Sequence, residues 1–304
     1  MERPSPTVSV LIATYNKRRT LQHAIDSVLW QTFGDFELWV IGDGCTDDSA
    51  ELVASYADPR VHWYNLPANS GYQSAPHNEG LRRARGRYIA YLNHDDVWLP
   101  EHLARLVAVL EGGDADVAYS ILEWVLSWRD DYADIPACPT APVPPEASAT
   151  MHRRALIDEI GDWKAPHEVY SVPRAEFLRR AQFAGKRFVL VPRLTVLKFG
   201  AESTDYGAAG RQAEYMARVR REPDFAHAEI AALLVRAQHE LERPLSLRRL
   251  RQQLLHAVRR WLVGRGIDPA RLVVWRPRGR HIRAWRRAHA LDADAPERPL
   301  RARR

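Results

Sequence analysis

The sequence of 304 residues is 46% hydrophobic and 27% charged, a composition typical of a globular protein that excludes a disordered chain. Its two cysteines, Cys45 and Cys138, exclude a disulfide scaffold and a multi-cysteine zinc site, and no run approaches the roughly 18 apolar residues of a membrane span. The net charge of +6 hides an asymmetry, because residues 206–304 carry 23 Lys and Arg against 10 Asp and Glu, whereas residues 1–205 carry 21 against 28.

This asymmetry predicts an anionic partner for the C-terminal part. A net charge of +13 is typical of a segment that meets a membrane surface, a nucleic acid or a phosphorylated carrier. Because the segment contains no recognisable nucleic-acid-binding motif, nucleic acid is not the expected partner. The first residues, Met1–Pro4, lack the charged-then-apolar pattern of a signal peptide, which favours the cytoplasm.

The first 120 residues alternate between strand and helix patterns, as in an α/β fold with a mostly parallel sheet. Apolar, β-branched runs predict strands, and apolar residues at helical spacing predict the helices between them. The strands are expected at 8–13, 36–41, 61–64 and 88–92, and the helices at 21–29, 47–56, about 71–84 and about 100–110.

Beyond residue 116 the pattern is irregular. Two strands are expected before the proline-rich loop Pro136–Pro145, short helices over 151–160 and 173–184, and a closing strand over 186–197. After about residue 200 only helices are predicted, and the last dozen residues are expected to be disordered. We therefore divide the chain into an α/β domain, residues 1–205, and a basic helical extension, residues 206–304.

Within the extension, residues 246–264 predict a basic amphipathic helix. One interpretation is peripheral attachment to the anionic inner face of the membrane, where each Arg adds about 1 kcal/mol. The favoured interpretation is an ordinary helix that packs on the sheet and turns its arginines to solvent, because amphipathic helices usually find a protein core.

Polar clusters follow three of the predicted strands. They are Thr14-Tyr15-Asn16, Gly42-Asp43-Gly44 and Asn93-His94-Asp95-Asp96. One such cluster is usually a turn or a helix cap. Three of them in sequential strands predict a nucleotide-binding crevice, because ligands of open α/β sheets bind at the carboxyl ends of the strands.

Five blocks carry a resemblance to a known family. They are VSVLIATYNK (8–17), LWVIGDGCTD (38–47), NSGYQSAPHNEG (69–80), GRYIAYLNHDDVWLPEHL (86–103) and MHRRALIDEIGDW (151–163). In their order and spacing the sequence resembles the family 2 glycosyltransferases, which have the nucleotide-sugar-binding GT-A fold. The resemblance runs from Val8 to about Phe199. It implies transfer of a sugar from a nucleotide-sugar donor to a hydroxyl of a glycan or lipid-linked acceptor, in a bacterium during surface polysaccharide or glycolipid assembly.

The resemblance also implies a donor site. Tyr15 would pack against the nucleotide base, Lys17 would lie near the phosphates, and Asp43 would bond the base edge. The other nucleotide-binding residues implied are Ala13, Thr14, Asn16, Asn69, Gly71 and Asn78. Gly42 and Cys45 replace an acid and a serine of the family pattern, and we expect Cys45 to be a small buried residue because nothing nearby would activate a thiolate.

The cluster Asn93-His94-Asp95-Asp96 matches the family's metal-binding signature. Asp95 is the expected ligand of Mg²⁺ or Mn²⁺, which would neutralise the leaving diphosphate. Asn93 stands where the first acid is expected, which predicts weaker metal affinity or a contact through water. Asp96 is expected to position the donor sugar or a metal-bound water, and His94 occupies the signature's variable middle position.

The catalytic base is less well matched. An inverting transfer needs a carboxylate to take the acceptor proton. Glu168, beside His167, is the favoured candidate. A second alignment selects Glu176 and leaves Arg174 at the base position. In a third case both glutamates are solvated helix residues, and the base lies elsewhere or is absent.

Two other functions fit parts of the sequence. The departures at Asn93 and at the base suggest a non-catalytic GT-A domain that binds a nucleotide-sugar or a partner. A nucleotidyltransferase shares the sheet topology, but it needs a Gly-rich basic loop after the first strand, and residues 14–17 are not one.

Overall fold

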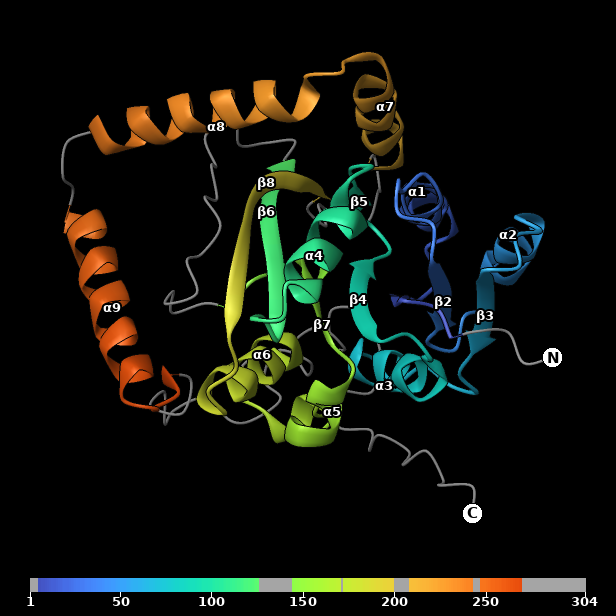
Figure 1. Ribbon diagram of the computed structural model, residues 1–304, viewed down its shortest axis with the longest axis horizontal. Helices are drawn as coiled ribbons and strands as arrows, with labels where there is room; N and C mark the ends of the chain where they lie inside the picture. The colour runs from blue at the N-terminus through green and yellow to red at the C-terminus, as the bar shows by residue number, and fades with distance from the viewer. Residues whose placement is uncertain (1–4, 126–143, 171, 200–207, 243–246, 270–304) are drawn as a thin grey trace.

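A computed structural model describes residues 5–125, 144–170, 172–199, 208–242 and 247–269 (Figure 1). Its centre is an eight-stranded mixed sheet in the order β3-β2-β1-β4-β7-β6-β8-β5. The strands are β1 (Val8–Thr14), β2 (Phe36–Gly42), β3 (Val61–Asn65), β4 (Tyr88–Asn93), β5 (Val97–Trp98), β6 (Val117–Val125), β7 (Thr150–Arg153) and β8 (Phe188–Phe199).

Helices flank both faces of the sheet (Figure 1). They are α1 (Arg18–Leu29), α2 (Ser49–Ser55), α3 (Ser74–Arg83), α4 (His102–Glu111), α5 (Ala155–Ile160), α6 (Pro173–Phe183), α7 (Ala208–Arg221), α8 (Phe225–Glu242) and α9 (Leu247–Gly264), with short 3-10 turns at Ala147–Ala149 and Pro166–Glu168. The four strands and four helices expected before residue 111 are all present, with ends that differ by a few residues.

Strands β3, β2, β1 and β4 are parallel, and both faces of β1 and β4 are covered. On one face, Val10 and Ile12 pack in a core with Leu21 and Ile25 of α1. On the other, Leu11 packs in a core that also holds residues of α5 and α6. Double coverage explains why β1 and β4 are nearly continuous apolar runs rather than alternating ones. The register aligns Ala13 with Asn93 and Thr14 with Gly42, so the strands end together at one edge.

The prediction of a helix over 151–160 is wrong for its first half. Residues Thr150–Arg153 form strand β7, which is antiparallel to both β4 and β6. Met151 and His152 are fully buried there, so pairing with two neighbouring strands outweighs a local helical preference. The helix is confined to Ala155–Ile160.

The extension continues the fold beyond the sheet. Helix α7 packs against α1, and α8 crosses β8. Met216 of α7 and Phe225 of α8 are buried in a cluster with Leu197 and Phe199 of β8. The described part of the extension is helical, as predicted. Four features of the sequence analysis lie outside the described residues: the boundary near residue 205, the proline-rich loop as far as Pro142, Cys138 and the last dozen residues.

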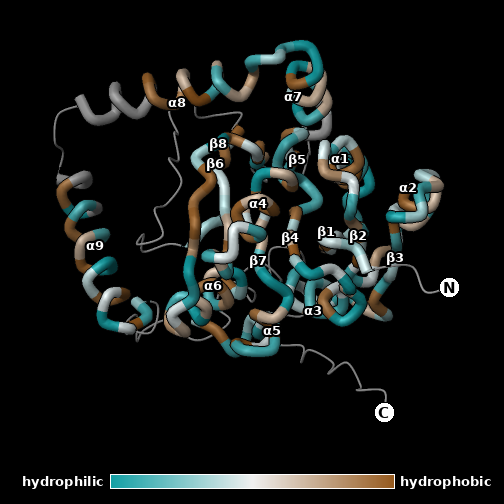
Figure 2. The backbone as a smooth tube through the Cα atoms, viewed as in Figure 1, coloured by the Kyte–Doolittle hydropathy of each residue, from teal (hydrophilic) through white to brown (hydrophobic). Residues whose placement is uncertain are grey.

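Helix α9 differs from the favoured interpretation of the tail. Leu250, Leu254 and Val258 are exposed instead of packed on the sheet. Figure 2 shows hydrophobic and hydrophilic positions interspersed along this helix, which stands apart from the sheet. No helix among the described residues is both long enough and apolar enough to cross a membrane.

Candidate functional site

A cavity of about 540 Å³ lies where β1, β2 and β4 end. Seven of the predicted donor-site residues line it, namely Ala13, Thr14, Tyr15, Asp43, Asn69, Gly71 and Asp95, together with Tyr72, Gln73, Pro76, Asn93, His94, Val172 and Lys198. The parallel register thus brings the three polar clusters together, although they are separated in sequence. Asn16, Lys17, Asn78, Asp96 and Glu168 do not form its wall.

The turn after β1 is held by Asn16. This residue has a positive φ of 50°, a conformation that asparagine tolerates better than most residues. Its Oδ1 accepts from the backbone N–H of Thr46 at 2.8 Å, so it joins the first strand's turn to the second's. Lys17 follows. Burial lowers its pKa, and the carboxylate of Asp95 opposes that shift, which places the ammonium close to the cavity.

Asp43 organises the loop over the cavity. Its carboxylate accepts from the backbone N–H of Ser70 at 2.9 Å and of Gly71 at 3.2 Å, and the residue is 4% exposed. Asn69 Nδ2 donates to the Asp43 carbonyl at 3.1 Å. The charged acceptor therefore fixes the loop that faces Tyr15, and such bonds are stronger than neutral ones.

Steric contacts explain why the residues on either side of Asp43 are glycines. A Cβ on Gly42 would lie 2.4 Å from Asn65 Oδ1 and 2.7 Å from the Trp63 ring, so this chain has no room for the acid of the family pattern. Gly44 has a φ of +73°, and a Cβ there would lie 2.4 Å from the backbone nitrogen of Asn69. Both positions let the turn approach its neighbours closely.

Asn93 is committed to its own cluster. Its Nδ2 donates to Asp96 Oδ2 at 3.0 Å, and its backbone N–H donates to Ser148 Oγ at 3.1 Å. The Asn93 side chain, which replaces the first acid of the signature, is thus hydrogen-bonded within the protein, although the residue borders the cavity.

Asp96 is fully buried and acts as an anchor. It accepts from Ser148 Oγ at 2.5 Å, from Lys198 Nζ at 3.3 Å and from the Phe199 N–H at 3.3 Å. Burial raises the pKa of its carboxyl to about 6, while Lys198 pulls it down. The expectation that Asp96 touches the donor or a metal-bound water is not matched by this position, because these contacts enclose its carboxylate.

Lys198 is a site residue that the sequence did not reveal. Its side chain is 11% exposed, lines the cavity and pairs with Asp96. Burial lowers its pKa, but Asp96, Glu146 and Asp95 raise it by more, so the ammonium stays charged. The sequence signal is a lysine near the end of a largely apolar strand, and it can be interpreted only once β8 is known to end at the cavity.

Asp95 is the predicted cation ligand, and His94 lies next to it at the cavity. The backbone carbonyl of Asp95 accepts from Gln212 Nε2 of α7 at 2.6 Å, which holds the residue in place. His94 Nδ1 lies 3.1 Å from the Ala13 carbonyl, which can only accept, so the hydrogen is on Nδ1 and Nε2 is the nitrogen left for a ligand. The described residues contain no cluster of three metal-ligating side chains. One carboxylate suits Mg²⁺ or Mn²⁺ that takes further ligands from a diphosphate.

Neither candidate base lines the cavity. Glu168 is exposed, and its Oε2 accepts from the Ala165 N–H at 2.7 Å, which closes its own turn. Glu176 pairs with Arg180 at 2.9 Å and Lys164 at 3.3 Å. Arg174 is buried and donates to the carbonyl of Pro144. The choice between the glutamates therefore stays a prediction.

Two further predicted residues have local roles. Asn78 Nδ2 donates to the Trp163 carbonyl at 2.8 Å, and Asn78 Oδ1 accepts from the Trp163 N–H at 3.0 Å. The amide therefore ties α3 to the segment before the 3-10 turn. Cys45 is half-buried, and burial raises the pKa of its thiol, which agrees with an unreactive residue.

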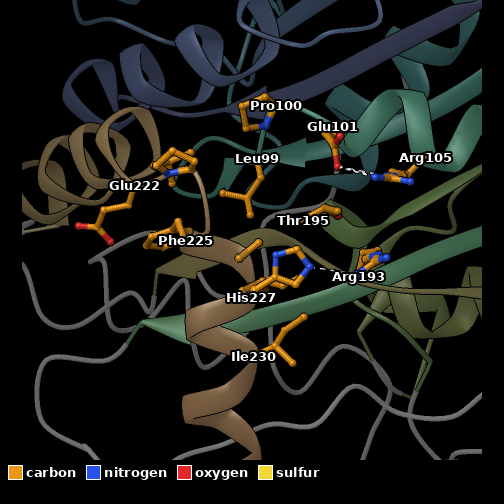
Figure 3. A pocket seen from close by; sticks show the side chains of 14 residues that line it. Leu99, Pro100, Glu101, Arg105, Arg193, Thr195, Glu222, Phe225, His227 and Ile230 are labelled. Atoms are coloured by element: carbon orange, nitrogen blue, oxygen red, sulfur yellow. Dashed lines mark hydrogen bonds and ion pairs between the residues drawn. The ribbon is translucent and has the colours of Figure 1, made fainter.

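A second hollow of about 250 Å³ lies between the start of α4, β8 and the α7–α8 corner (Figure 3). Leu99, Phe225 and Ile230 contribute apolar surface. Arg105 is paired with Glu101 at 2.8 Å there. None of the predicted site residues borders this hollow, so it is separate from the cavity at the strand ends.

Residues 9–133 match the sequence pattern of the family described as glycosyl transferase family 2. This segment is therefore similar to family 2 of the glycosyltransferases. The three clusters at the ends of β1, β2 and β4 all fall within it. The recognition made from the five sequence blocks is confirmed.

Curated relatives of this chain carry related names. The succinoglycan biosynthesis protein ExoO of Rhizobium meliloti is 37% identical over 120 residues, which are 40% of this chain and 34% of ExoO. The UDP-Glc:alpha-D-GlcNAc-diphosphoundecaprenol beta-1,3-glucosyltransferase WfgD of Escherichia coli is 30% identical over 116 residues, 38% of this chain and 46% of WfgD. The chain thus spans about a third of the length of relatives such as ExoO.

The fold matches that of S. aureus TarS, whose residues 1–349 were crystallised with UDP-GlcNAc. The TM-score is 0.55 with 21% identity, over 65% of this chain and 59% of the TarS chain. At this identity the match shows the fold alone. The prediction of an α/β GT-A fold with a helical extension is confirmed.

Proposed function

We propose that this family 2 glycosyltransferase transfers a sugar from a nucleoside diphosphate donor to an acceptor hydroxyl with inversion at the anomeric carbon. The observation that carries the proposal is that Asp43 and Asp95, from different strands, border one cavity at the carboxyl ends of the sheet. This is the arrangement that the family resemblance predicts for base recognition and for the diphosphate.

The base of the donor would lie between Tyr15 and the loop that Asp43 fixes. The Asp43 oxygens still have lone pairs that can accept from a base N–H, and a base lacking that N–H would leave a buried acceptor unpaired. Uridine is the first base to test, because TarS was crystallised with UDP-GlcNAc and WfgD is named for a UDP-Glc donor.

The diphosphate would meet positive charge. Asp95, with His94 beside it, would hold Mg²⁺ or Mn²⁺, and the cation would supply Lewis-acid stabilisation of the leaving diphosphate. The Asp95 carboxylate opposes the lowering of both lysine pKa values by burial, although the pKa of Lys17 stays lowered and that of Lys198 is raised. Both ammonium groups can thus neutralise phosphate oxygens at the same place.

The base is proposed to be Glu168, which would take the proton of the acceptor hydroxyl as its oxygen attacks the anomeric carbon. To act, its carboxylate must leave the Ala165 N–H. The acceptor is proposed to be a glycan or a lipid-linked glycan, since ExoO and WfgD are named for succinoglycan assembly and for a diphosphoundecaprenol-linked acceptor. Peripheral contact with the membrane through the basic extension fits such an acceptor.

A second function has its own support. In the part of the chain that the structure describes, Asp43 and Asp95 are the carboxylates that border the cavity. Asp43 is engaged by the loop. A domain that binds a nucleotide-sugar or a partner without turnover would need no other acid there.

Calorimetric titration of UDP, GDP and dTDP, with Mn²⁺ and with EDTA, tests the donor site. We expect binding of one nucleotide in the micromolar range, dependent on the metal and lost in Asp95→Ala. The exposed Asp48→Ala is the matched control. A folded protein that binds none of the three nucleotides would overturn the proposal. Turnover of the matching donor that requires Asp95 would exclude the non-catalytic alternative.

A further inference from the structure

Helix α9 presents an apolar stripe to solvent. Leu250, Leu254, Val258 and Trp261 recur every three or four residues and are 55%, 66%, 47% and 56% exposed. At 3.6 residues per turn these four side chains lie on one face, and Leu255 is exposed at its border. A single exposed leucine is ordinary, but a continuous stripe marks a contact surface.

The charge of α9 is one-sided. Its 18 residues include five arginines and no Asp or Glu. Arg251, Arg259 and Arg260 are exposed. The guanidinium of Arg265, just after the helix, lies 4.4 Å from the centre of the Trp261 ring. The apolar stripe is therefore accompanied by positive charge only.

Helix α8 differs from α9 in the charge that accompanies its exposed apolar side chains. It also exposes apolar side chains, Leu234 at 61% and Val235 at 60%. However, the sequence of α8 has three glutamates and one arginine, so its charge is negative. Exposed apolar surface is thus found on both helices, whereas its combination with positive charge is particular to α9.

The C-terminal end of α9 is held by the rest of the protein. Leu262 is 8% exposed, and Gly266, with a φ of +73°, turns the chain so that the Ile267 N–H donates to the Leu262 carbonyl at 2.9 Å. Burial lowers the pKa of the Arg179 guanidinium in α6, and the nearby carboxylate of Asp268 opposes that shift. These contacts hold the end of the helix, whereas its described side chains from 250 to 261 are exposed on every side, the stripe included.

We infer that α9 lies in the plane of an anionic lipid bilayer, with its stripe among the acyl chains and its arginines at the headgroups. A helix with a large apolar face and Arg on its polar face binds such interfaces, and Trp favours the boundary. A second copy fits the face poorly, because α9 offers no acid to pair with the arginines of its twin. This contact would bring the enzyme to a lipid-linked acceptor, a role that rests on the proposed function.

Sedimentation of the full chain with vesicles tests the inference. One set of vesicles is phosphatidylcholine, and the other is an equimolar mixture with phosphatidylglycerol. We expect the wild type to partition onto the mixed vesicles about 100-fold better than onto neutral ones, and to lose that advantage in high salt. The triple variant Leu254→Gln/Val258→Gln/Trp261→Gln should bind both sets at least about 50-fold more weakly.

Two further variants separate the contributions. Arg251→Gln/Arg259→Gln/Arg260→Gln should lose about 100-fold on mixed vesicles and change little on neutral ones. Leu234→Gln/Val235→Gln on α8 is the matched control and should bind like the wild type. Because all these positions are exposed, the variants should keep the wild-type circular dichroism and melting temperature.

Several results would overturn the inference. They are no vesicle binding, equal binding to both lipid sets, equal loss in the α8 control, or self-association that the stripe variant abolishes. UDP titration of the same preparations keeps the two proposals apart. A wild-type protein that binds UDP but no vesicles would reject only the membrane contact. A wild-type protein that binds the mixed vesicles but not UDP would reject only the donor site.

Discussion

At the scale of single residues, Asp43 has one observed role and one proposed role, and both depend on its negative charge. Its carboxylate holds the loop at Ser70 and Gly71, and the same oxygens are proposed to accept from the donor base. A neutral amide at this position could accept one of the two loop bonds but would point an N–H at the other donor. The shape of the cavity and its affinity for the base should therefore change together.

Asp43→Asn should weaken binding of the preferred nucleotide by about tenfold to a hundredfold, since bonds to a charged acceptor contribute about 1.5–3 kcal/mol. Titration calorimetry measures the effect, and Asp48→Asn, on the exposed side of the next turn, is the control. Unchanged affinity in a folded Asp43→Asn variant would show that the carboxylate has no part in donor binding.

Asp96 should make stability depend on pH. Its pKa of about 6 exceeds that of an unfolded Asp, about 3.9, so between these values the native state holds a proton that the unfolded chain has released. Stability should then fall as pH rises through this window, by up to about 3 kcal/mol from this group.

Urea unfolding of Asp96→Asn in EDTA measures this contribution. The variant should lack the fall between about pH 4 and pH 6, while Asp114→Asn, an exposed control, should keep it. A profile for Asp96→Asn that parallels the wild type would assign the pH dependence to other groups.

At the scale of elements, the strand ends explain what the sequence could predict. The polar clusters after β1, β2 and β4 are local patterns, and parallel pairing brings any such ends to one edge, so Asp43 and Asp95 could be placed beforehand. Lys198 could not, because it meets Asp96 across 102 residues and only through the path of β8. Strand β7 was missed because its pairing with β4 and β6 is non-local too.

Asn78 distinguishes the nucleotide-binding role expected from the sequence from the structural role that its hydrogen bonds indicate. Its amide joins α3 to Trp163 by two hydrogen bonds, so Asn78→Ala should cost about 1–3 kcal/mol of stability. Thermal unfolding measures that cost, and UDP affinity should stay within about twofold. Asn78→Asp, which keeps one acceptor, should be intermediate. Reduced UDP affinity at unchanged stability would instead support the nucleotide-binding role expected from the sequence.

At the scale of the whole molecule, the extension takes part in the candidate site. Gln212 of α7 is fully buried, and its Nε2 donates to the Asp95 carbonyl at 2.6 Å. The division at residue 205 stays a prediction about folding units. For the position of Asp95, however, α7 belongs with the sheet.

Gln212→Ala should weaken Mn²⁺-dependent binding of UDP by about tenfold, because the buried Asp95 carbonyl loses its donor. The weaker binding that remains in EDTA should be unchanged. Glu214→Ala, on the exposed side of the same helix, is the control. An equal loss with and without Mn²⁺ would point to general damage rather than to the position of Asp95.

The Gln212–Asp95 contact spans 117 residues, which has a consequence during synthesis on the ribosome. The N-terminal strands emerge first and can pair with one another, but the support for Asp95 arrives only after α7 has left the exit tunnel. A ligand stabilises only a state that already contains its site. The nucleotide should therefore give little help to the early nascent chain, which must rely on its own apolar strands and on chaperones until the late helices dock.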